Sequence, residues 1–197
     1  MPFISGNYYL NISQMQNNAE LIWAYGYSVG WTKEATAAIL GNMQAESSIN
    51  PGIWESLNPY SGGYGLVQWT PYTKYSQWAT AQGYAWQDNG AAELLRISYE
   101  AANNIQWFYN AEIGMSPPIS FSEFLESTLD ISTLSDYWLY FYEHPRDPVA
   151  TRQARRDNAA YWYNYLDDEP PEPPEPPEPG TQIPIWLLFK FKRKWYS

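Results

Sequence analysis

The residues best suited to chemistry lie within residues 42–69, where Glu46 is predicted near the C-terminal end of a helix. Burial in a cleft disfavours the charged form of a carboxyl group, and the negative end of a helix dipole has the same effect. A carboxyl group that stays neutral near pH 7 can donate a proton to the leaving oxygen of a sugar, as glycoside hydrolysis requires. The alternative is that Glu46 is an exposed side chain at a helix end with no chemical role.

The cysteine and histidine counts exclude several other kinds of site. The chain has no cysteine and a single histidine, His144. Cysteine nucleophiles, thiolate metal sites and zinc sites with several histidine ligands are therefore excluded. Zinc amidases and papain-like endopeptidases, which also degrade cell walls, need those groups. A glycosidase that works with carboxyl groups needs neither, and we expect no metal or cofactor.

Aromatic residues make up 18% of the chain, with 11 Trp and 18 Tyr. Such rings stack on the apolar faces of sugars, but a tyrosine-rich surface on a protein with few charges is an equally good explanation. The net charge of −10 argues against nucleic acid as the main partner, because phosphate backbones attract basic proteins.

One predicted helix must position Glu46. The segment KEATAAILGNMQAES has helical periodicity, with its apolar residues on one face. Thr32 is a suitable N-cap, and Glu34 lies in the first turn. The helix must end before Asn50-Pro51, because a residue that precedes proline is biased away from the helical conformation. Glu46 is thus expected beside the loop that follows the helix.

Capping residues and turn formers predict the remaining elements. Residues 48–72 are rich in proline and glycine, which predicts turns, and GYGLVQWT within them is either a short strand or an ordered loop. A capping box of Ser13 with Gln16 predicts a helix that ends near Gly30. Further helices are predicted at 73–81, at 89–111, after a capping box of Ser120 with Glu123, at about 133–143, and from Asp147-Pro148 to about Leu166.

Two segments at the C-terminal side differ in composition from the rest. Residues 167–180 repeat proline and glutamate, which predicts an extended linker. Residues 181–197, TQIPIWLLFKFKRKWYS, form an aromatic and basic tail that is too short to span a bilayer. Three roles stay open for this tail: binding to an anionic envelope surface, docking on a partner protein, or no ordered partner at all.

Two blocks of the sequence resemble a known family. QAESSINP at residues 44–51 and GYGLVQWT at residues 63–70 are similar to the Glu-Ser and Gly-Leu-Met-Gln motifs of goose-type lysozymes and lytic transglycosylases. The ending Gln-Trp-Thr resembles the phage tail lysozyme family. YEHP at residues 142–145, with Arg152 and AAYWY at residues 159–163, also resembles that family, whose usual form has arginine in place of His144. The resemblance covers about residues 10–166.

The resemblance implies cleavage of the β-1,4 bond between N-acetylmuramic acid and N-acetylglucosamine, with Glu46 as the general acid. Ser47 and Gln68 are expected along the cleft, where the amide of Gln68 would bind sugar hydroxyl or acetamido groups. Tyr64 and Trp69 are expected to stack on sugars, with loop or core packing as the alternative for both.

The second carboxyl group that glycosidases usually need is not fixed by the sequence. Glu55 is the only other acid between Glu46 and Gln68, and nothing sets its direction. Without a partner, water attacks with backbone or amide assistance, or the muramyl 6-hydroxyl attacks internally and gives an anhydro product. Arginines of the last predicted helix either bind wall anions or pair with acids such as Glu143 and Asp147; they are Arg152, Arg155 and Arg156.

The sequence therefore predicts an α+β, mostly α, lysozyme-like domain at residues 1–166 with a small β or loop lobe, then the linker and the tail. The expected function is a phage or prophage peptidoglycan hydrolase without a cofactor. A lytic transglycosylase and a non-catalytic wall-binding or virion module are the alternatives. The start of the chain lacks the features of a signal peptide and no apolar run reaches membrane-spanning length. We therefore expect a virion-associated protein, or one released to the wall, with peptidoglycan and virion proteins as its partners.

Overall fold

Helix α2 (Lys33–Ser47) lies at the centre of the fold, and all of its residues from Ala35 to Met43 are buried. In the computed structural model, which describes residues 2–145 and 147–170, the Thr32 side chain accepts a hydrogen bond from the Ala35 amide and starts this helix, as predicted. Ser48 ends it in a left-handed conformation with φ of 51°. Glu46 is therefore in the last turn, as expected.

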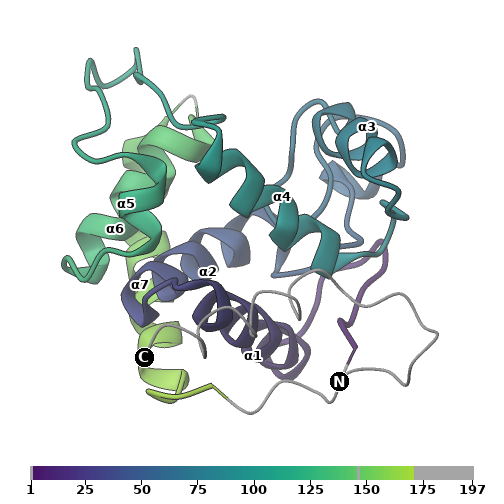
Figure 1. The fold of residues 1–197 in the computed structure, drawn as a ribbon, viewed down its shortest axis with the longest axis horizontal. Coiled ribbons are helices and arrows are strands. Elements are labelled where there is room, and N and C mark those ends of the chain that lie inside the picture. Colours follow the sequence, from purple (N-terminus) through teal and green to yellow (C-terminus); the bar gives the residue numbers. More distant parts are fainter. Residues whose placement is uncertain (1, 146, 171–197) are drawn as a thin grey trace, which may run out of the picture.

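Helices α6 (Ile131–Trp138) and α7 (Pro148–Tyr165) pack against α2 (Figure 1). The crossing of α2 and α7 is so close at Gly41 that a Cβ atom there would lie 2.5 Å from the backbone nitrogen of Ala159. Only glycine fits this position without a shift of one helix. The close crossing brings the side of α7 that carries Arg155 against α2. As predicted, Asp147 caps α7.

Helix α1 (Ile12–Val29) ends at Gly30, as predicted, but the prediction of its start is wrong. The capping box is formed by Asn11 and Gln14, not by Ser13 and Gln16. Both pairs have the same spacing, and asparagine is as good an N-cap as serine. The earlier start buries Leu10 and Met15 on either side of the box, whereas Ile12, which would precede a cap at Ser13, is 46% exposed.

Helix α3 (Thr73–Ala81) has the predicted bounds, whereas α4 (Gly90–Ala102) is shorter than the predicted helix at 89–111. The helix ends at Asn103 and Asn104, and Asn104 has φ of 51°. Asparagine tolerates this left-handed conformation better than most residues, so the pair stops the helix. Figure 1 shows α4 running from the lobe of α3 toward the lobe of α5 and α6.

Helix α5 (Phe121–Leu125) starts with the predicted capping box of Ser120 and Glu123. The helix predicted at about 133–143 is α6 followed directly by a π-helical turn, η2 (Leu139–Glu143). A π-helical turn changes the direction in which the following side chains point, and such turns often occur at functional sites. The turn ends at His144, which has φ of 51°.

Residues 48–72 form a loop lobe around a short 3-10 turn, η1 (Glu55–Leu57). Its backbone pairing consists of two isolated antiparallel bridges, which join Tyr64 to Trp54 and to Trp69. GYGLVQWT is thus an ordered loop rather than a strand. The prediction of a mostly helical α+β fold with a small β or loop lobe is confirmed.

The structure describes the C-terminal side of the chain as far as residue 170. The predicted linker at 167–180 therefore lies outside the described residues from position 171 onward, and the predicted tail at 181–197 lies outside them entirely. Of the helices that the structure describes, none is long and apolar enough to cross a membrane.

Candidate active site

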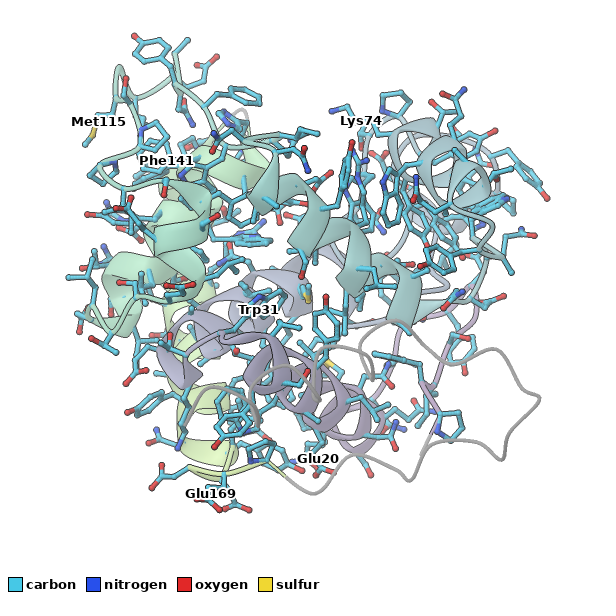
Figure 2. All side chains as sticks on the ribbon, in the orientation of Figure 1. Glu20, Trp31, Lys74, Met115, Phe141 and Glu169 are labelled. Carbon is cyan, nitrogen blue, oxygen red and sulfur yellow. The ribbon has the colours of Figure 1, made fainter. Side chains whose placement is uncertain are left out.

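A cleft of about 600 Å³ lies where the loop lobe meets the helical part of the molecule. Figure 2 labels Lys74, which belongs to α3, and Phe141, which lies in the lobe of α5 and α6. Lys74 lines one wall of the cleft, and residues 142–145, which follow Phe141, line the other. The lining residues are Tyr9, Glu46, Ile53, Trp54, Glu55, Ser56, Val67, Gln68, Trp69, Thr70, Lys74, Gln106, Phe108, Tyr142, Glu143, His144 and Pro145.

Glu46 faces this cleft with 23% of its side chain exposed and forms an ion pair with Arg155 of α7. The guanidinium is buried and is held on the other side by Asn42, since Nη1 donates to Oδ1 of Asn42 at 3.1 Å and to its carbonyl oxygen at 3.3 Å. A guanidinium in contact with a carboxyl group favours the ionised form of that group. Burial and the helix dipole around Glu46 could be expected from the sequence, but the guanidinium of Arg155 beside it could not.

The arginines of α7 pair with protein groups, but not with the acids that the sequence analysis considered. Arg155 pairs with Glu46, and the Nε of Arg156 donates to Asp136 at 2.8 Å. Arg152 donates to the hydroxyl of Tyr140 at 3.2 Å. Spacing along one helix shows which arginines are neighbours, but it does not show which acids the packing of other helices brings to them.

Glu143 is a cleft residue that the sequence analysis considered only as an arginine partner. One of its oxygens, Oε1, accepts a hydrogen bond of 2.7 Å from the indole nitrogen of Trp138. Burial raises the pKa of Glu143 well above its usual range, and the negative charge of Glu46 raises it further, against the opposing effects of Arg155 and Trp138. The signal was present in the sequence, because Glu143 belongs to the second block that resembles the lysozyme family.

Glu55 also lines the cleft, from the loop lobe. Its Oε2 accepts a hydrogen bond of 2.8 Å from the backbone nitrogen of Gly63, and the residue is otherwise exposed. The cleft thus collects three carboxyl groups from three elements: Glu46 from α2, Glu55 from η1 and Glu143 from η2. Glycosidases use carboxyl groups that face one cleft, one as the proton donor and another as the nucleophile or base.

Gln68 lines the cleft, as expected, but its amide nitrogen is used within the protein. Trp69 borders the cleft with a ring that is only 3% exposed, which agrees with the packing alternative rather than with stacking on sugars. The amide nitrogen of Gln68 donates to the carbonyl oxygens of Ile53 and Gly65, at 3.2 and 3.0 Å. The ring of Trp69 stacks on Tyr75 with 4.9 Å between centroids. These contacts shape the loop wall of the cleft.

The structure places Ser47 and Tyr64 away from the cleft, in contrast to the expectation for both. Ser47 is fully buried, and its hydroxyl donates to the carbonyl oxygens of Met43 and Leu66, at 2.9 and 2.8 Å. Tyr64 is 1% exposed and packs on Trp54 with 4.7 Å between ring centroids. Neighbours in sequence point in different directions at a helix end and in a tight loop, so proximity to Glu46 and Gln68 did not place these side chains in the cleft.

Two buried glutamates of α4 form hydrogen bonds with residues of the loop lobe. Glu93 accepts a hydrogen bond of 2.7 Å from the backbone nitrogen of Leu66, and Glu100 accepts one of 3.1 Å from the indole nitrogen of Trp69. Glu100 also accepts from Arg96 at 2.8 Å. Burial raises the pKa of both glutamates, most strongly for Glu93. The loop lobe is thus fixed to α4 through buried carboxyl groups.

Aromatic rings at the cleft offer surfaces for the apolar faces of sugars. Phe108 is 52% exposed and stacks on His144 with 4.4 Å between centroids, and Tyr9 is 65% exposed. Burial lowers the pKa of His144. In the part of the chain that the structure describes, no group of three or more histidine, aspartate or glutamate side chains is placed to hold a metal ion.

Comparisons with known proteins agree with this arrangement. The family model described as phage tail lysozyme matches residues 17–166. Morphogenesis protein 1 of Bacillus phage B103 is 42% identical over 166 residues, which cover 83% of this chain and 43% of that protein. The chain therefore spans less than half the length of this relative. Both matches associate the chain with phage proteins, and the family match identifies it as lysozyme-like. The chain belongs to the phage tail lysozyme family.

Proposed function

We propose that the protein is a muramidase that cleaves the β-1,4 bond between N-acetylmuramic acid and N-acetylglucosamine in bacterial peptidoglycan. The observation that supports this proposal most strongly is the position of Glu46, which lies in the last turn of the central helix and lines the cleft. A polysaccharide bound in this cleft would contact the exposed rings of Tyr9 and Phe108. It would also lie near the three carboxyl groups that line the cleft. Glu46 is the proposed general acid.

Hydrolysis follows from these groups without a cofactor. Glu46 gives its proton to the glycosidic oxygen, the bond from that oxygen to the sugar's C1 breaks, and the leaving sugar keeps the electron pair. Water then adds to C1 and returns a proton to a carboxylate of the cleft, so the protein ends with the protons it began with. Glu55 and Glu143 are the two other carboxyl groups placed to accept it. Gln68 and Trp69 support substrate binding by shaping the loop wall.

Two alternatives have support of their own. The family resemblance includes lytic transglycosylases, which break the same bond but let the muramyl 6-hydroxyl attack C1 in place of water. The relative from Bacillus phage B103 is named a morphogenesis protein, which favours a virion module that keeps the fold without catalysis. In either case we propose that the protein acts on or at the wall as part of, or after release from, a phage particle.

The deciding experiment is digestion of purified peptidoglycan by the wild type and by Glu46→Gln, with products identified by mass spectrometry. Glutamine keeps the shape of the side chain and removes the proton donor. Glu112→Gln is the matched control, because Glu112 is exposed and does not line the cleft. We expect muropeptides from the wild type and the control, and none from Glu46→Gln.

The product masses separate the three functions. Reducing muramic acid ends indicate hydrolysis, and anhydro ends, which are lighter by one water, indicate transglycosylation. Activity of Glu46→Gln equal to that of the wild type would remove Glu46 from the mechanism. A wild type that binds wall fragments of several chemotypes but releases nothing would support the virion module.

A further inference from the structure

The N-terminal arm, residues 2–10, lies before the part of the chain that matches the family model, which begins at residue 17. One of its side chains, that of Tyr9, lines the cleft and is 65% exposed. Figure 1 shows the arm, in purple, between α1 and the lobe that carries α3. The cleft of this protein therefore includes a residue from outside the matched range.

Two asparagines hold the arm on the rest of the molecule. Asn18 of α1 pairs with the backbone of Ile4 in both directions, because Oδ1 accepts from the Ile4 amide and Nδ2 donates to the Ile4 carbonyl oxygen, each at 2.8 Å. Nδ2 of Asn50 donates to the carbonyl oxygens of Gly6 and Tyr8, at 2.8 and 2.6 Å. Both asparagines are fully buried, so the loss of these hydrogen bonds would leave polar groups without partners. The arm is thus a fixed part of the fold.

The backbone is fixed on both sides of Tyr9, whereas its ring is exposed. The preceding carbonyl oxygen accepts from Asn50, and the following amide donates to Oγ of Ser48 at 2.9 Å. Ser48 is the residue that ends α2, two positions after Glu46. The ring of Tyr9 is therefore attached at the end of the helix that carries the proposed general acid. A side chain on a backbone that is already ordered loses less conformational entropy when it binds a ligand.

The chemistry of this position suits a sugar. Pyranose rings have an apolar C–H face and a polar rim, which match the face of a tyrosine ring and its hydroxyl group. The cleft also carries the carboxyl groups of Glu46, Glu55 and Glu143, which would repel an acidic ligand. An uncharged glycan therefore fits this part of the cleft better than an acidic polymer does.

We propose that Tyr9 is a sugar-binding residue of the cleft and that Asn50 and Ser48 hold it in place through the backbone of the N-terminal arm. This inference rests on the proposed function, because the ligand is the β-1,4-linked glycan strand of peptidoglycan. The ring of Tyr9 stacks on one sugar of the bound strand and takes no part in bond cleavage. The arm thus extends the substrate site beyond the residues that the family model matches.

The test measures turnover and binding of soluble peptidoglycan fragments. We expect Tyr9→Ala to raise KM by about 3-fold to 10-fold with kcat unchanged, because the lost contact holds the strand before and during the reaction alike. Kd for the same fragments, measured by calorimetry in the Glu46→Gln background, should rise by the same factor. Tyr9→Phe keeps the stacking ring and should restore most of the wild-type affinity.

Tyr8→Ala is the matched control, because Tyr8 is the preceding residue, is 44% exposed and does not line the cleft. Its KM and Kd should equal those of the wild type. A wild-type affinity in Tyr9→Ala, or an equal loss of affinity in Tyr8→Ala, would overturn the inference.

A double-mutant cycle tests the positioning by Ser48. Ser48 has φ of 51°, so glycine fits its backbone while it removes the hydroxyl group that accepts from the Leu10 amide. We expect Ser48→Gly to raise KM in the wild type and to have no further effect on KM in Tyr9→Ala, because the hydroxyl group acts through the ring of Tyr9. Additive effects on KM would contradict this role of Ser48.

The outcomes distinguish this inference from the proposed function. If the wild type neither binds nor cleaves wall fragments of any chemotype, the proposed function fails. If the wild type cleaves the fragments and Tyr9→Ala has the same KM and Kd, the present inference fails alone.

Discussion

The hydroxyl of Tyr142 donates a hydrogen bond of 2.6 Å to Oε2 of Glu100. The other oxygen of the same carboxyl group accepts from Trp69 at 3.1 Å. Tyr142 and Trp69 line the cleft from opposite lobes, so a single buried carboxyl group sets the distance between the two walls.

Tyr142→Phe should therefore loosen the cleft and lower stability. The change leaves an oxygen of buried Glu100 without its donor, which costs about 1–3 kcal/mol in the free energy of unfolding. Urea denaturation measures this loss, and KM for wall fragments should rise because one wall is no longer fixed. Tyr109→Phe is the control, since Tyr109 is 55% exposed and does not line the cleft. Equal stability of the two variants would show that this hydrogen bond contributes nothing to the fold.

The turn that carries Gln68 should depend on Gly65 for two separable reasons. Gly65 has φ of 80°, and a Cβ atom there would lie 2.6 Å from the carboxyl oxygens of Glu93. Gly83 also has φ of 80°, but nothing lies within 4 Å of its Cβ position. Gly83→Ala should thus cost only the backbone strain, about 1–2 kcal/mol, whereas Gly65→Ala should cost clearly more. Thermal unfolding of both variants measures the difference, and equal losses would mean that Glu93 moves aside freely.

Ser47→Ala distinguishes a substrate contact from a structural one. The buried hydroxyl joins the end of α2 to Leu66, so its removal should lower the free energy of unfolding by about 1–3 kcal/mol. KM should stay at the wild-type value when the assay is run well below the melting temperature. A raised KM with unchanged stability would instead support the sequence-based expectation that Ser47 binds the sugar.

The elements of this fold were predictable where local chemistry decides them. Thr32, Ser120 and Asp147 cap helices because their short side chains accept hydrogen bonds from the free amides of a first turn, and this depends on few neighbours. The start of α1 was not decided in this way, because Asn11 and Ser13 offer equal caps and burial of Leu10 and Met15 distinguishes them.

The site was predictable only in part, because its charges come from segments far apart in the sequence. Glu46 was identified through the QAESSINP motif that resembles the lysozyme family, because its place at a helix end also allows an exposed side chain without a chemical role. Its partner Arg155 lies 109 residues later and reaches it through the close crossing of α2 and α7 at Gly41. Glu143 faces the cleft through a π-helical turn, which helical periodicity does not predict.

The role of the C-terminal segment can be tested by deleting residues 180–197. The segment carries four basic residues, whereas the whole chain has a net charge of −10, so it is suited to an anionic envelope. We expect unchanged activity on soluble wall fragments and reduced activity on whole cells, measured in parallel by muropeptide release and by loss of turbidity. Equal loss in both assays would indicate that the segment packs on the lysozyme-like domain.

Glu93 should make the protein less stable as pH rises. Burial raises its pKa in the folded protein, so between its ordinary pKa and that raised value the unfolded chain releases a proton that the folded protein keeps. The contribution of Glu93 is therefore fully present at acid pH and declines as pH increases. Glu93→Gln cannot ionise, so the melting temperature of the wild type relative to this variant should fall as pH rises above the ordinary pKa of glutamate, about 4.3.

Glu123 should change stability with pH in the opposite direction, and it serves as the internal control. Its pKa is lowered by the hydrogen bonds from the backbone and side chain of Ser120 in the capping box. The stability that it contributes is present above its ordinary pKa and is lost as pH falls, so the wild type should gain on Glu123→Gln as pH rises. Melting curves of the two variants at matched pH values should thus diverge in opposite directions from the wild type. Parallel curves would mean that Glu93 ionises in the folded protein as readily as in the unfolded chain. That result would contradict a neutral carboxyl group at Glu93 in the folded protein.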